Sequence, residues 1–159
     1  GIHKEFLYSA RLDNLATVFC AIESLVEYAN DLPNVDSADV SLVVAFDHEE
    51  VGSTSAPGAG SPVMEEAILR ISAALQHDPN NGGAATNRIT PDLYAACIRK
   101  SFILSIDQAH ALHPNHASKH EPAHAPLLNA GVVIKTNSNQ RYATNGMTGF
   151  VVRELGRRD

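Results

Sequence analysis

Apolar residues recur along this chain at two spacings, and each spacing predicts a different secondary structure. Between residues 15 and 29 they recur at intervals of three and four, the period of one buried helix face. These positions are Leu15, Val18, Phe19, Ile22, Leu25, Val26 and Ala29. A first helix with a buried face is therefore expected here.

Two Ser/Thr-Pro pairs predict the starts of further helices. Ser61-Pro62 and Thr90-Pro91 each offer a capping hydroxyl followed by proline at the first helical position. The apolar stripes that follow are Met64, Ala67, Ile68, Ile71 and Leu75 after the first pair, and Leu93, Ala96 and Cys97 after the second. A last helix is expected within residues 145–155, and the Asn- and Gly-rich stretch 78–88 predicts a surface loop.

Three short, continuous apolar runs predict strands. They are Val40–Phe46, Ser101–Ile106 and Gly131–Lys135, and such runs are typical of strands buried on both faces. Because helices alternate with these runs, the predicted fold class is α/β, with a mostly parallel sheet flanked by helices. No repeat or linker interrupts the chain, so residues 1–159 are interpreted as part of a single domain.

Composition narrows the classes of function. The 44% hydrophobic content can bury a core, and a net charge of −6 with scattered basic residues argues against nucleic acid and acidic membranes. No apolar run reaches the roughly 18 residues of a membrane span, and the start does not resemble a signal peptide. Cys20 and Cys97 form no CxxC pair, which favours free thiols over a disulfide. A cytoplasmic protein is expected.

Acidic residues follow the predicted strands. Glu49 and Glu50 follow the first strand, Asp107 follows the second, and Asp13 stands at the start of the first helix. In open α/β sheets, ligands bind at the carboxyl ends of strands. Each acid alone fits a helix cap or a solvated turn, but several acids on one rim would repel without a cation. The pattern predicts a two-metal site with one unligated acid as a base.

Five segments resemble, in content and order, the motif series of the aspartyl aminopeptidases. They are SARLDNL (9–15), DHEEVGS (47–53), DQAHALHPN (107–115), KHE (119–121) and NQRYAT (139–144). The resemblance runs over nearly the whole chain. It implies an internal segment of a phosphorylase/hydrolase-like metallopeptidase core, from an enzyme that removes N-terminal Asp or Glu from peptides.

The resemblance also implies roles for individual acids. It makes Asp13 the carboxylate that bridges two zinc ions, Glu50 and Asp107 their terminal ligands, and Glu49 the general base toward water. Mn²⁺ and Co²⁺ are alternative metals. Lys135 is implied to face the acidic side chain of the substrate, and a solvated lysine at a strand end is an equally weighted interpretation.

Histidines are concentrated between residues 110 and 124, where five of the eight lie. The resemblance implies that His110, His113 and His124 organise the substrate side of the site. The spacing of His110 and His113 also fits two ligands of a single metal. Tyr142 is implied to support the substrate pocket, as is its neighbour Arg141.

The sequence also departs from the family pattern. Neither an Asp-x-His motif before Asp13 nor a C-terminal histidine ligand is found in these 159 residues, and the family's inserted domain is missing. The parent protein is therefore expected to be a self-associating aminopeptidase, while this chain alone is expected to be weakly active or inactive. Two alternatives stay open: a non-catalytic fragment or interaction module, and a related two-zinc hydrolase such as a carboxypeptidase or deacylase.

Overall fold

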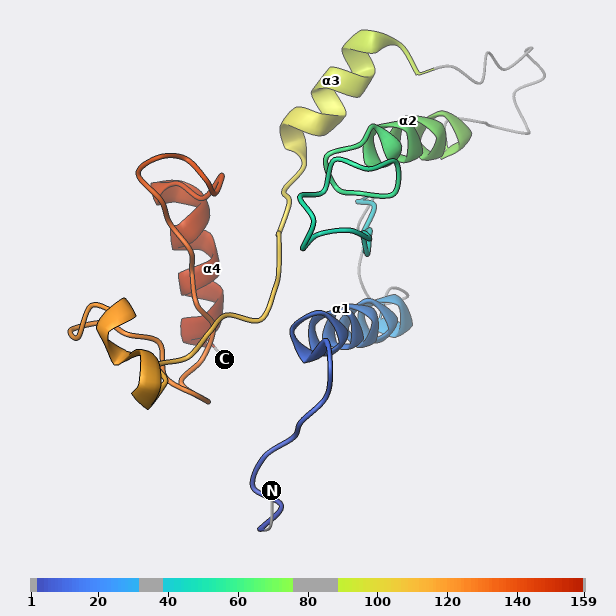
Figure 1. Ribbon diagram of the computed structural model, residues 1–159. Coiled ribbons are helices and arrows are strands. Elements are labelled where there is room, and N and C mark those ends of the chain that lie inside the picture. The colour runs from blue at the N-terminus through green and yellow to red at the C-terminus, as the bar shows by residue number, and fades with distance from the viewer. Residues whose placement is uncertain (1–2, 32–38, 76–88, 159) are drawn as a thin grey trace. The chain divides into compact units, whose positions relative to one another are not determined.

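The computed structural model describes residues 3–31, 39–75 and 89–158, so the predicted loop at 78–88 lies outside the described residues. These residues form α-helices α1 (Leu12–Asp31), α2 (Val63–Leu75), α3 (Pro91–Lys100) and α4 (Gly146–Arg158), and the 3-10 helix η2 (Pro114–Lys119) (Figure 1). The chain divides into two compact units, residues 1–106 and 107–159. Each unit is described by itself.

All the predicted helices are confirmed, and their caps explain where two of them begin. The Thr90 hydroxyl accepts a hydrogen bond from the Leu93 amide at 3.2 Å, with Pro91 at the first helical position of α3. The Ser61 hydroxyl accepts from the Val63 amide at 3.3 Å at the start of α2. Each cap satisfies an amide that has no partner inside its helix, so local sequence fixes these boundaries.

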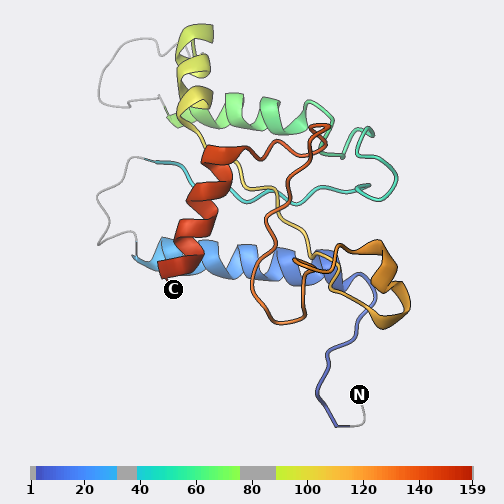
Figure 2. The same ribbon diagram turned by 90° about the vertical axis from the view of Figure 1, so that its left-hand side faces the viewer.

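The predicted parallel sheet is wrong for the part of the chain that the structure describes. Residues 40–46, 101–106 and 131–135 are irregular segments without strand pairing, and the ribbons show no arrows there (Figure 2). A β-branched apolar run favours an extended backbone, but a strand also needs a hydrogen-bonded neighbour. Backbone bonds outside the helices close local turns, as from the Gly60 amide to the Ser53 carbonyl.

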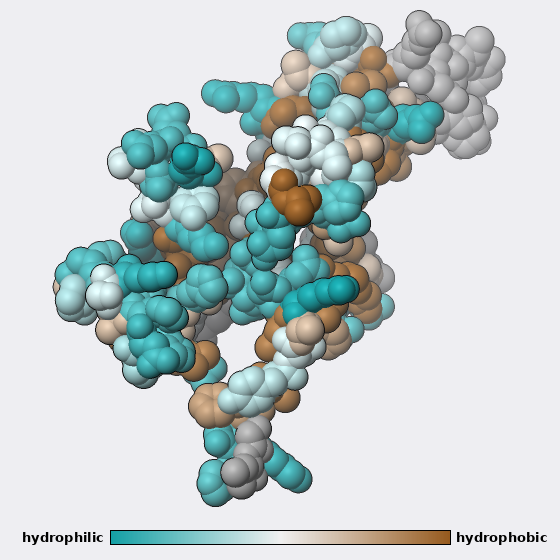
Figure 3. All heavy atoms as spheres, in the orientation of Figure 1, coloured by the Kyte–Doolittle hydropathy of each residue, from teal (hydrophilic) through white to brown (hydrophobic). Residues whose placement is uncertain are grey.

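The predicted burial of the helix faces is also wrong for the described residues. Among them no hydrophobic side chain is buried, and Phe19 of α1 remains 64% exposed. Hydrophobic residues are accordingly visible on the surface in Figure 3. The periodicity predicted correctly which segments are helical and which apolar residues share a face. Burial of that face also requires a second apolar surface, and the described parts of the chain do not supply one.

Two smaller expectations concern the cysteines and the membrane. Cys20 and Cys97 are free, exposed thiols, as the sequence predicted. Within the described ranges, no helix combines the length and the apolar character that crossing a bilayer requires.

Candidate functional site

Glu49 and Glu50 lie in a loop of the first unit, residues 47–61, that is closed by its own hydrogen bonds. The Gly52 amide donates to the Glu49 carbonyl at 3.0 Å, and the Asp47 amide donates to the Pro57 carbonyl at 3.3 Å. Both glutamates are exposed. The loop therefore presents the predicted base and the predicted ligand side by side on one internally bonded turn.

His48 anchors the start of this turn. Its backbone is left-handed, with φ of 61°, and its amide donates to Asp47 Oδ1 at 2.8 Å. Its carbonyl accepts from the Ser53 amide at 2.9 Å, and its ring Nδ1 shares a 2.7 Å hydrogen bond with the Ser55 hydroxyl. Both the backbone and the ring of His48 thus tie the two arms of the loop together.

Gly58 allows the loop to close tightly. A Cβ at this position would lie 2.3 Å from the carbonyl oxygen of Ser53, which is backbone and cannot swing away. The Gly60 amide donates to the same carbonyl at 2.9 Å. Only a residue without a side chain fits at Gly58, so the small residues that follow the acidic pair serve the closure of the loop.

Asp13 lies in the first turn of α1, as predicted. Its Oδ1 accepts a hydrogen bond from the Asn14 amide at 2.7 Å, and the preceding Arg11 is left-handed, with φ of 59°. A carboxylate in the first turn also interacts favourably with the helix dipole. The structure therefore gives Asp13 a helix-start role, which does not prevent its exposed carboxylate from binding a ligand.

In the second unit, three predicted site residues come together. Lys135 Nζ lies 3.8 Å from Asp107 Oδ2 and 5.8 Å from the centre of the Tyr142 ring. The ammonium thus interacts with a carboxylate and with an aromatic face. Sequence reasoning assigned these residues to one site but did not foresee that Lys135 and Asp107 pair directly.

The histidine-rich segment forms a closed loop whose base is a 2.7 Å bond from the Leu112 amide to the Pro126 carbonyl. His113 Nδ1 accepts from the Asn115 amide at 3.1 Å and so caps η2. His124 Nδ1 bonds to the Glu121 carboxylate at 2.5 Å. His113 and His124 therefore have local structural partners. His110, just before the loop, is exposed.

The Glu121 carboxyl of this loop has a lowered pKa. Hydrogen bonds from the Ala123 amide, and then from His124, lower the pKa of Glu121 below its ordinary value of 4.5. Donors aimed at a carboxylate stabilise its charged form. Glu121 therefore helps to hold the loop in shape, a role that the sequence reasoning did not assign.

The donors of a complete metal site are not gathered within the described residues. No group of three or more His, Cys, Asp or Glu side chains is placed there to hold an ion. Carboxylate oxygens suit zinc, but a zinc sphere needs four ligands. Asp13 and Glu50 lie in the first unit and Asp107 in the second. Neither unit by itself offers enough of the predicted ligands.

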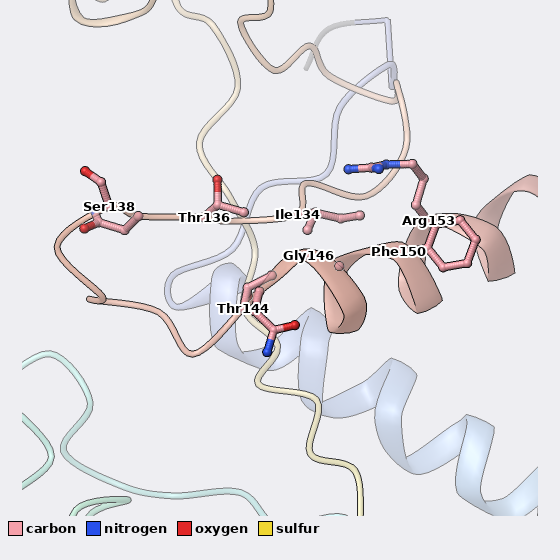
Figure 4. A pocket seen from close by; sticks show the side chains of 10 residues that line it. Ile134, Thr136, Ser138, Thr144, Gly146, Phe150 and Arg153 are labelled. Atoms are coloured by element: carbon pink, nitrogen blue, oxygen red, sulfur yellow. The ribbon is translucent and has the colours of Figure 1, made fainter.

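Sequence reasoning also missed a pocket of about 420 Å³ in the second unit. Figure 4 shows Ile134, Thr136 and Ser138 on an extended segment opposite Phe150 and Arg153 of α4. Gly149 lies between them, and a Cβ there would be 3.4 Å from the Thr144 side chain and 3.6 Å from Ile134. Gly149, a glycine inside α4, is the sequence signal that could have indicated this close approach.

A second missed feature is the distribution of left-handed backbone. Among the described residues, six that are not glycine have positive φ: Lys4, Arg11, His48, Ser53, Asn129 and Gln140. Four of them fall in the segments 9–15, 47–53 and 139–144. Such conformations are unfavourable and are enriched at functional sites. Their positions independently point to the segments that carry the resemblance.

Comparisons with known proteins identify relatives that are named aspartyl aminopeptidases. The chain is 47% identical over 156 residues to a probable aspartyl aminopeptidase of Ricinus communis, which covers 98% of this chain and 29% of the relative. It is 40% identical over 159 residues to the aspartyl aminopeptidase of Aspergillus oryzae, covering 99% and 31%. The chain thus spans about 30% of the length of these relatives and corresponds to a part of such longer proteins.

A solved structure is similar as well. A chain in the cryo-EM structure of the Ape4 and Nbr1 complex matches with a TM-score of 0.80 and 39% identity, over 99% of this chain and 27% of that chain. A model of the family described as Aminopeptidase I zinc metalloprotease (M18) matches residues 1–159, the full length of the sequence. The chain therefore belongs to the Aminopeptidase I zinc metalloprotease family, M18.

Proposed function

We propose that residues 1–159 form part of the single catalytic domain of an aminopeptidase that removes N-terminal Asp or Glu from peptides. The observation that carries this proposal is the group formed by Lys135, Asp107 and Tyr142. It places a cation beside a carboxylate that is a predicted metal ligand. A substrate carboxylate could pair with this ammonium while the scissile bond lies near the ligand.

Glu49 is proposed as the general base. Its carboxylate is exposed on a turn that hydrogen bonds hold at both ends. Such a group can take a proton from the attacking water and pass it to the leaving amine, a contribution of typically 10²–10⁴-fold. The fixed turn supports the correct aim of the carboxylate.

We propose Asp13 as the bridging ligand and Glu50 and Asp107 as terminal ligands of two zinc ions, with Mn²⁺ or Co²⁺ as possible substitutes. Zinc itself accords with the family description. The chemistry that such a pair supplies is the activation of water at neutral pH. Because the two histidine ligands that the family pattern includes are not found in these 159 residues, we propose that this chain alone is weakly active or inactive.

The remaining site residues are proposed to shape the substrate side. Tyr142 supports Lys135 through its ring. His113 and His124 act through the loop that they hold together, and His110 stands next to its base. None of these three histidines is assigned as a metal ligand in the proposal.

Location and partners belong to the proposal too. Free cysteines support a reducing, cytoplasmic location. The large exposed apolar side chains support self-association in the intact protein. The similar structure is itself a complex of two proteins, Ape4 and Nbr1.

The test compares the product of the whole reading frame with the 159-residue chain. Both are assayed with added zinc on a peptide with free N-terminal Asp, on its N-acetylated form, and on the same peptide beginning with Leu. We expect the longer protein to cleave only the free Asp peptide, and Glu49→Gln to reduce kcat about 10²- to 10⁴-fold.

Three results would overturn the proposal. Cleavage of the acetylated peptide would indicate a related hydrolase of other specificity. If the longer protein were inactive both with and without added zinc, it would be a non-catalytic module. Full activity in Glu49→Gln would remove the base. Full activity of the 159-residue chain would overturn only the part that concerns this chain alone.

A further inference from the structure

We propose that His48 and Ser55 form a positioning pair that aims the Glu49 carboxylate. The inference rests on the proposed function, because it assigns the pair a role in the reaction for which Glu49 is the base. Neither residue was assigned a role from the sequence. Neither is proposed to touch the substrate or the reacting atoms.

The backbone of His48 has an unusual conformation. Its φ of 61° is left-handed, a conformation that side-chain-bearing residues adopt only when surrounding contacts hold them. Those contacts are local: the amide donates to Asp47 Oδ1 at 2.8 Å, and the carbonyl accepts from Ser53 at 2.9 Å. This conformation sets the direction in which Glu49 and Glu50 leave the turn.

A side-chain hydrogen bond joins His48 to Ser55. His48 Nδ1 and Ser55 Oγ are 2.7 Å apart, and they join residues on opposite arms of the loop. Among the contacts of the described residues, one other ionisable group lies near the ring. It is the Asp47 carboxylate, whose Oδ2 is 3.7 Å from His48 Nε2. The ring is 47% exposed, so its packing contributes little and the bond to Ser55 is its main structural link.

Backbone contacts of Ser53 hold the far arm of the loop in place. The Ser53 carbonyl accepts from the Gly60 amide and is approached closely by Gly58. These contacts fix the backbone of the arm that carries Ser55. A bond from His48 to this arm transmits that rigidity to the turn carrying Glu49.

Proton transfer is sensitive to such placement. A misplacement of about 1 Å can cost about 100-fold in rate even when every reacting group is present. Neither His48 nor Ser55 is proposed to touch the substrate, so the pair should affect the chemical step and not substrate binding. Loss of the His48 to Ser55 bond should therefore lower kcat and leave KM nearly unchanged.

The experiment uses the product of the whole reading frame with the variants His48→Ala, Ser55→Ala, the double variant and His48→Asn. We expect each single alanine variant to lower kcat about 10- to 100-fold with KM within about twofold. The double variant should be no worse than the more impaired single variant, because both remove one bond. Asn tolerates left-handed backbone and can bond to Ser55, so His48→Asn should recover most of the activity. His3→Ala, an exposed histidine outside the loop, is the control.

Amide hydrogen exchange provides a readout that does not depend on activity. The Ser53 and Gly60 amides should exchange about tenfold faster in His48→Ala and Ser55→Ala than in the parent, and zinc stoichiometry should be unchanged. Unchanged exchange, or a parent-like kcat in either alanine variant, would overturn the inference. An inactive parent protein would instead overturn the proposed function, so the two failures are distinguishable.

Discussion

Lys135 Nζ and Asp107 Oδ2 lie 3.8 Å apart, with both side chains partly open to solvent, at 38% and 53% exposure. An ion pair this exposed contributes little stability, because water screens it. The lysine can therefore exchange Asp107 for another carboxylate at small cost.

In the product of the whole reading frame, replacing Lys135 with Met should reduce kcat/KM for an N-terminal Asp peptide about 10- to 100-fold. A hydrogen bond to a charged group contributes about 1.5–3 kcal/mol, and each 1.4 kcal/mol is tenfold. The same peptide with N-terminal Ala should lose far less. Steady-state kinetics on both peptides checks this, with Lys100→Met in α3 as the control. Equal losses on both peptides would show that Lys135 does not read the acidic side chain.

Gly58→Ala should destabilise the loop at 47–61, while Gly156→Ala should stabilise α4. At Gly58 a Cβ meets the Ser53 carbonyl oxygen at 2.3 Å, whereas at Gly156 nothing lies within 4 Å. Overpacking costs about 1–3 kcal/mol, and alanine gains about 0.5–1 kcal/mol over glycine inside a helix. Denaturant unfolding of the two variants provides a matched comparison, and effects of the same sign would contradict it.

Asn145→Ala should fray the start of α4. The Asn145 carboxamide oxygen accepts from the Met147 amide at 2.9 Å and from the Thr148 amide at 3.0 Å, while the Asn145 amide donates to the Thr148 hydroxyl at 2.9 Å. Removing such a cap costs about 1 kcal/mol. Hydrogen exchange of the Met147 and Thr148 amides should accelerate. Asn145→Asp should preserve protection, and equal acceleration in both variants would contradict the cap.

The histidine-rich loop should lose stability in acid. The pKa of Glu121 is lowered from 4.5, first by the Ala123 amide and then by His124. Because the folded pKa is below the unfolded one, the contribution is complete above about pH 4.5 and is lost as pH falls through the folded pKa. Carboxyl NMR titration should show His124→Ala raising the Glu121 pKa only in part, since the amide remains. A Glu121 pKa at or above 4.5 in the parent would contradict this account.

Local features of the sequence determined the helices and the candidate residues. Thr90-Pro91 and Ser61-Pro62 predicted helix starts because capping involves atoms only two or three residues apart. The order of the five motif segments identified the family before any coordinates. The role of Gly58, which makes room for the Ser53 carbonyl, became apparent only from the structure.

The tertiary structure decided whatever depends on partners distant in sequence. The valines of residues 40–44 favour extended backbone, but only a neighbouring strand turns such a segment into a sheet, and the described residues show none. The apolar spacing in α1 predicted a helix but could not predict whether its apolar face is buried, because burial needs a second surface to pack against. For the same reason the sequence could assign Asp107 and Lys135 to one site, while only folding could bring their charges within 3.8 Å.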